Sequence, residues 1–93
     1  MRAGLLLAIA TCALAAGTAR AACDEPERRQ FDFWLGDWTV AAKGQDRARS
    51  RITRLHGDCG LREEYATLDG NYAGTSLSAY DAARGVWHQT WVD

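Results

Sequence analysis

Residues that build metal and redox sites are scarce in this sequence. Its two histidines, His56 and His88, are 32 residues apart, and no HxH or HExxH spacing joins either one to a second ligand. None of its three cysteines forms a CxxC pair with another. We therefore expect neither a metal site nor a cofactor in this chain.

Signatures of catalysis are also missing. The segment Gly74-Thr75-Ser76-Leu77-Ser78 lacks the final glycine of a G-x-S-x-G elbow. Glu63 and Glu64 are adjacent, so on a strand they face opposite sides and cannot act together on one substrate. No glycine cluster both follows a strand and opens a helix, which excludes the usual phosphate-binding loops. Binding is favoured over catalysis, and an enzyme acting on a periplasmic small molecule stays open as an alternative.

The chain has no apolar run long enough to span a bilayer. The run from Ala3 to Ala16 suits the core of a signal peptide, which follows a positive residue such as Arg2. Ala19-Arg20-Ala21 is an A-x-A cleavage motif, so we expect residues 1–21 to be removed between Ala21 and Ala22. The mature protein, 22–93, is then periplasmic or secreted, with no membrane span. A lipoprotein attached through the nearby Cys23 is the rival reading, but the residues before it do not form a lipobox.

Basic residues are not in excess. Without Arg2 and Arg20 the mature chain keeps nine Lys or Arg residues against twelve Asp or Glu. A nucleic-acid-binding domain usually carries a basic stripe, and the only candidate is a set of alternating arginines that fits a solvated strand face: Arg47, Arg49, Arg51 and Arg54. We expect no nucleic-acid partner.

Two cysteines, Cys23 and Cys59, remain after the predicted cleavage. Thiols outside the cytoplasm tend to oxidise, so an even number of cysteines favours a disulfide. A Cys23–Cys59 bridge would close a long loop in a small domain, where such a constraint stabilises most.

The mature sequence predicts a single, mainly β domain. Asp24, Pro26 and Gly36 mark the limits of a short helix over 25–35, with Phe31, Trp34 and Leu35 on one apolar face. The apolar period then changes to two, with turn residues between the runs, which predicts five antiparallel strands. These strands are Trp38–Ala42, Ser50–His56, Leu61–Thr67, Thr75–Asp81 and Val86–Val92, with turns at 44–46, 57–58, 69–71 and 82–85.

Alternation along the strands assigns side chains to faces. In the third strand Leu61, Glu63 and Tyr65 share a face, so Glu63 points inward and needs a partner. In the last strand Trp87 and Trp91 share a face with Gln89, opposite to the residues between them. The sequence ends directly after this apolar strand, and we expect either that the domain is incomplete at its C-terminus or that it self-associates through the Val86–Val92 edge.

The segment Phe31-Asp32-Phe33-Trp34-Leu35-Gly36-Asp37-Trp38 resembles the opening motif, FDFW-[LI]-G-x-W, of a family of exported bacterial proteins of unknown function. Later blocks around Cys59–Tyr65, Ser76–Asp81 and Val86–Asp93 resemble that family too. The family is similar to lipocalin-like or calycin-like β-barrels, and the resemblance implies that this chain forms part or all of such a barrel. It implies no activity for any residue here, because fold alone does not assign function.

Four tryptophans in 72 mature residues exceed what so small a core needs. We expect a small, largely apolar ligand to contact a set of aromatic and polar side chains on the sheet, since barrel mouths are common ligand sites. The candidates are Trp38, Glu63, Tyr65, Tyr80, Trp87, His88 and Trp91. The alternative is a structural or protein-interaction module of the cell envelope, in which these rings are core and the last strand pairs with a partner chain.

Overall fold

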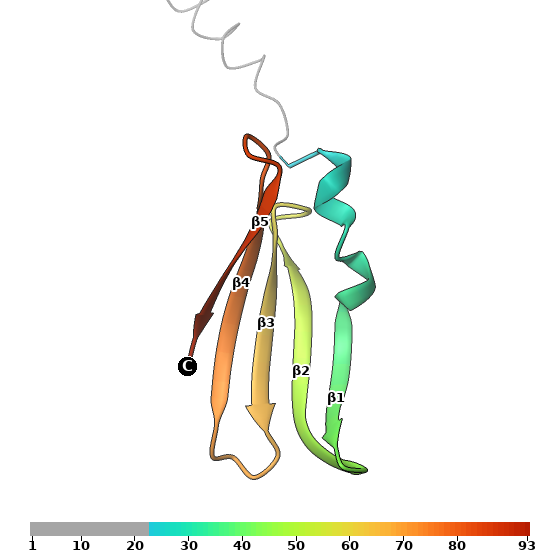
Figure 1. The fold of residues 1–93 in the computed structure, drawn as a ribbon, viewed down its shortest axis with the longest axis vertical. Coiled ribbons are helices and arrows are strands. Elements are labelled where there is room, and N and C mark those ends of the chain that lie inside the picture. Colours follow the sequence, from blue (N-terminus) through green and yellow to red (C-terminus); the bar gives the residue numbers. More distant parts are fainter. Residues whose placement is uncertain (1–22) are drawn as a thin grey trace, which may run out of the picture.

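The computed structural model of this protein describes residues 23–93, so the predicted signal peptide and its cleavage between Ala21 and Ala22 lie outside the described residues. Five antiparallel strands form one sheet in the order of the sequence (Figure 1). They are β1 (Gly36–Ala42), β2 (Gln45–Leu55), β3 (Gly60–Thr67), β4 (Ala73–Asp81) and β5 (Val86–Val92). No helix within 23–93 is long and apolar enough to cross a bilayer.

The predicted number, order and direction of the strands are confirmed, and the range predicted for β5 agrees with the structure at both ends. The sheet is an open meander in which each strand pairs only with its neighbours along the chain. Among residues 23–93, β1 and β5 are therefore its two edges, and the sheet does not close into a barrel (Figure 1).

The first hairpin turn differs from the prediction. The sequence placed the turn at 44–46, whereas the structure turns at Lys43 and Gly44 and continues β2 from Gln45. Both turn residues have positive φ, +53° and +75°, as a two-residue type I′ hairpin requires. Because this turn needs only two residues, Gln45 and Asp46 pair with Ala42 and Ala41 and lengthen the strand.

The predicted short helical segment before the first strand is present, but its type and extent differ from the single helix expected over 25–35. Two short 3-10 turns replace it, η1 (Pro26–Arg29) and η2 (Asp32–Trp34). Phe31 separates them with a non-helical backbone, φ −106° and ψ 17°, and its ring packs edge-on against Trp87. A continuous helix would not place both this ring and the next turn against the sheet, so tertiary contact outweighs the weak helical preference of the segment.

One face of the sheet, which we call the aromatic face, carries nearly all of the burial. The strand registers place Trp38, Tyr65, Tyr80, Trp87 and Trp91 on this face. The buried side chains of residues 23–93 also lie there, and half of them are hydroxyls: Ala48, Ile52, Leu61, Ser50, Ser76 and Ser78. The opposite face is exposed and carries arginines and threonines. The predicted face of Leu61, Glu63 and Tyr65 is confirmed by the alternating burial of β3.

Two links fasten the N-terminal turns over one end of the aromatic face. The predicted Cys23–Cys59 disulfide is present, with the two Cα atoms 4.9 Å apart. Asp32 accepts hydrogen bonds from Arg54 of β2, at 3.0 Å, and from Arg29. The bond from Arg54 lowers the pKa of Asp32, so this carboxylate stays ionised at neutral pH. Figure 1 shows the turns beside the end of the sheet where β2 meets β3 and β4 meets β5.

We expect loss of the disulfide to destabilise the domain strongly. The bridge spans 36 residues, and a loop of that length contributes about 3–4 kcal/mol in the chain-entropy account. The double variant C23S/C59S should therefore show a free energy of unfolding lower by about that amount in urea titrations. Wild-type protein held under reducing conditions is the matched control and should behave like the variant. An unchanged unfolding midpoint would contradict this role.

Candidate ligand-binding site

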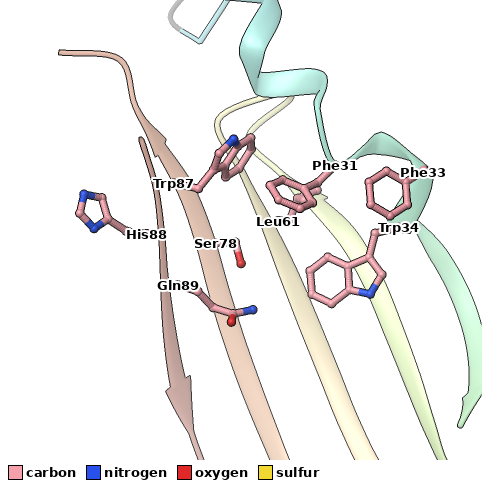
Figure 2. Close-up of a pocket in the computed structure, with 8 residues that line it drawn as sticks. All are labelled: Phe31, Phe33, Trp34, Leu61, Ser78, Trp87, His88 and Gln89. Carbon is pink, nitrogen blue, oxygen red and sulfur yellow. The ribbon is translucent and has the colours of Figure 1, made fainter. Parts of the chain in front are cut away.

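A cavity of about 360 Å³ lies between the 3-10 turns and the upper end of the aromatic face. We call it the cap cavity; its size is within the range of small-molecule sites. Aromatic rings form most of its walls, and polar side chains occur only on the sheet side. Its lining residues are Phe31, Phe33, Trp34, Leu61, Ser78, Trp87, His88 and Gln89 (Figure 2).

The wall nearest β5 is built by contacts between segments far apart in the sequence. The rings of Phe31 and Trp87 meet edge to face, with centroids 5.0 Å apart and planes at 88°. The Trp87 indole N–H donates to Gln30 Oε1 at 2.9 Å. These contacts hold both rings at defined angles, because an edge-to-face pair and a hydrogen bond are directional. The cavity wall is therefore organised before any ligand arrives.

Tyr80 supports Trp87 from below the turns. Its ring centroid lies 5.6 Å from that of Trp87, and the guanidinium of Arg28 lies 5.7 Å from the Tyr80 centroid. Arg28 also donates to the Cys59 carbonyl and pairs with Glu25. Tyr80 is half-buried and does not line the cap cavity, so it supports the wall from behind.

A row of polar side chains crosses the aromatic face next to the cavity floor. Glu63 accepts hydrogen bonds from Ser50 Oγ at 2.7 Å and from Ser76 Oγ at 3.1 Å. Gln89 Nε2 then donates to Ser76 Oγ at 3.4 Å. The inward Glu63 is expected to need a partner. Two serines that are at most 5% exposed fill that role. The row therefore runs from β2 across β3 and β4 to Gln89 on β5, and Gln89 also lines the cap cavity.

A second aromatic group lies at the other end of the same face. The rings of Tyr65, Tyr72 and Trp91 contact one another, with centroids 6.1 to 6.5 Å apart. Tyr72 Oη donates to Asp93 at 2.6 Å, a bond that raises the pKa of Tyr72 and lowers that of Asp93. Gly74 lies beneath the Trp91 ring, and any Cβ there would overlap it. None of these three rings lines the cap cavity.

His88 is among the residues that line the cap cavity, and Trp38 lies next to the cavity without lining it. Trp38 on β1 is 45% exposed; its indole N–H donates to the Trp34 carbonyl at 2.6 Å, and with Tyr65 it lines a second cavity of about 460 Å³. Figure 2 shows the His88 imidazole on the side of β5 opposite to Trp87 and Gln89. Its Nε2 lies 3.5 Å from the Asp81 carboxylate, in contact with solvent.

The structure thus brings some predicted residues together and separates others. Trp87 and His88 line the cap cavity, Glu63 belongs to the adjoining polar row, and Tyr80 supports the wall; Trp38, Tyr65 and Trp91 lie elsewhere on the face. Sequence reasoning missed several cavity residues: Phe31, Phe33, Trp34, Leu61, Ser78 and Gln89. The sequence does predict that Phe31 and Trp34 share an apolar face over the sheet, and this was the one indication that they lie at the site.

No group of three or more metal-ligating side chains occurs within the described part of the chain. Comparison with models of known protein families, with curated proteins and with solved structures finds no match. The resemblance to an exported family stays a prediction, and the chemistry of the site rests on its own geometry.

Glu63 should be needed as an acceptor for the two buried serines. In Glu63→Leu the hydroxyls of Ser50 and Ser76 lose that acceptor, and an unsatisfied buried polar group costs about 1–3 kcal/mol. We expect the free energy of unfolding to fall by an amount in that range in urea titrations. The isosteric Glu63→Gln keeps an acceptor oxygen and should lose less. Equal stability of Glu63→Leu and wild type would show that the row contributes nothing.

Proposed function

We propose that this protein binds a small, neutral, largely apolar molecule in the cap cavity. The observation that carries the proposal is an apolar space of about 360 Å³ walled by Phe31, Phe33, Trp34 and Trp87. Phe33 is 74% exposed and Phe31 38%, so these rings are not a closed core. Such rings offer a large contact area at a low cost in side-chain entropy, which suits recognition of a flat or aliphatic ligand.

The polar groups of the site favour a neutral ligand with one hydrogen-bonding group. Ser78 and Gln89 lie on the cavity floor and can each donate or accept. The charged side chain next along the face is Glu63, whose two carboxylate oxygens already accept serine hydroxyls. A carboxylate at this position disfavours an anionic ligand, because like charges repel strongly where water is partly excluded.

We further propose that the sheet is part of a calycin-like barrel in an exported protein. Short 3-10 turns precede β1, Gly36-Asp37-Trp38 opens that strand, and the strands follow one another as a meander. The disulfide agrees with a periplasmic or secreted location, since such bonds persist in oxidising compartments. The signal peptide expected at 1–21 belongs to the same proposal.

The test is titration of the purified, disulfide-bonded protein with N-phenyl-1-naphthylamine, a neutral apolar dye whose fluorescence rises in apolar sites. We expect saturable binding in the micromolar range. Trp87→Ala removes a cavity wall and should weaken binding by about tenfold or more. Leu77→Ala, which truncates an exposed side chain on the opposite face, is the matched control and should bind as wild type does.

Circular dichroism shows whether each variant keeps its sheet. Folded wild-type protein that gives no saturable signal would overturn the proposal. Binding that survives Trp87→Ala but is lost in Leu77→Ala would move the site to the opposite face, where Leu77 lines a cavity of about 470 Å³.

A further inference from the structure

The two edges of the sheet differ in how well they are blocked. The register between β1 and β2 shifts between Val40 and Ala41, where Arg47 of β2 has no partner on β1, and Asp37 of β1 carries a charge that pairs with Arg51. Irregularities and charges of this kind hinder pairing with another strand. Val86–Val92 contains no Lys, Arg, Asp, Glu or Pro, and its register with β4 has no shift. Of the two edges of the sheet formed by residues 23–93, β5 therefore carries fewer features that hinder a partner strand.

The sequence of β5 is nearly a palindrome centred on Gln89. Read from either end it begins with valine and then tryptophan, and only His88 and Thr90 differ on reversal. The order is Val86, Trp87, His88, Gln89, Thr90, Trp91, Val92. An antiparallel partner presents its residues in reverse order, so a palindromic edge strand matches a second copy of itself.

We propose that two copies of this protein pair through β5, antiparallel, about a two-fold axis at Gln89. Valine then lies opposite valine and tryptophan opposite tryptophan at both ends, while His88 lies opposite Thr90 and Gln89 opposite its own copy. A two-fold axis can pass through either type of residue pair in an antiparallel ladder. The result is one continuous sheet built from the two five-stranded sheets.

This register also preserves the faces. Directly opposed residues in an antiparallel pair point to the same side, so Trp87 and Trp91 of the second copy both lie on the aromatic face. An axis between two residues would join the aromatic face of one copy to the exposed face of the other. An axis at any other residue would leave part of the strand unpaired. Only the axis at Gln89 uses all seven residues of β5 with their faces aligned.

Pairing in this register would bring the exposed apolar side chains of β5 into contact with those of the second copy. Val86 is 43% exposed, Trp91 41% and Val92 65%, and each would lie against a like residue of the second copy. Paired aromatic and β-branched side chains stabilise adjacent strands. The Gln89 side chains can bond to each other, since an amide both donates and accepts.

Charges at the strand ends agree with this register. Asp93 follows β5, and Arg84 lies two residues before it. Antiparallel pairing places Asp93 of one copy opposite Gly85 of the other, beside Arg84, at both ends of the ladder. Within residues 23–93, Arg84 pairs with Asp81 at a distance of 3.8 Å, so its guanidinium can turn toward Asp93 of the second copy. Opposite charges therefore meet where the palindrome ends.

Dimer formation would also extend the candidate site. Trp87 lines the cap cavity, and Trp91 of the second copy would lie directly beside it on the same face. The proposal does not depend on ligand binding, because it follows from the edge and its sequence; it is the alternative to closing this sheet into a barrel, since both would use the β5 edge.

The experiment measures association of the exported, disulfide-bonded protein by sedimentation velocity over a range of concentrations. The variants Gln89→Lys and Gln89→Glu each place like charges across the proposed axis. Each should associate at least about tenfold more weakly than wild type, because opposed like charges repel across a strand pair. An equimolar mixture of the two should associate again, since opposite charges then meet at the axis. Gln45→Lys, at the start of β2, is the matched control and should dimerise as wild type does.

Recovery of association when the two variants are mixed distinguishes pairing across Gln89 from other kinds of association. If the variants fail to fold, mixing them restores no association. If β5 pairs with β1 of another copy, the mixture associates no better than each variant alone. Wild-type protein that stays monomeric at high concentration would overturn the proposal and leave the edge to another kind of partner. Single variants that dimerise as well as wild type would overturn it as well, because the axis would not lie at Gln89.

Discussion

The structure depends on the antiparallel register that places one set of alternating side chains on a single face. Only three apolar side chains of residues 23–93 are fully buried, Ala48, Ile52 and Leu61, so strand pairing carries more of this fold than a packed core does. Because every strand pairs in order, the same register gathers the aromatic rings and the Ser50, Glu63 and Ser76 row on one side. The functional surface follows from that constraint.

The N-terminal turns convert this open face into a site. The Cys23–Cys59 bridge and the Asp32–Arg54 ion pair hold them over one end of the sheet, where Phe31 meets Trp87. Without these ties the cavity would have a floor but no cover. The rings at the other end of the face do not line the cap cavity; one of them, Tyr65, lines a separate cavity of about 460 Å³ together with Trp38.

Much of the fold could be predicted from the sequence, and the site only in part. The period of two predicts both the strands and the faces, and an even cysteine count predicts the disulfide. The helix over 25–35 could not be corrected from local preference, because Phe31 leaves helical geometry to reach Trp87, 56 residues along the chain. The cavity depends on that long-range contact, so Trp87 was foreseen while Phe33 and Ser78 were not. His88 follows its alternation onto the opposite face, so it borders the cap cavity while its imidazole points away from Trp87 and Gln89.

We propose above that the cap cavity binds an apolar ligand. The most direct measurement is the nuclear magnetic resonance spectrum of the four tryptophan indole N–H groups of isotope-labelled protein, recorded during titration with N-phenyl-1-naphthylamine. With a ligand in the cap cavity, the signals of Trp34 and Trp87 should change most and saturate, while that of Trp91, at the other end of the face, should change least. Unchanged indole signals in folded protein, or changes that are largest at Trp91, would contradict this proposal.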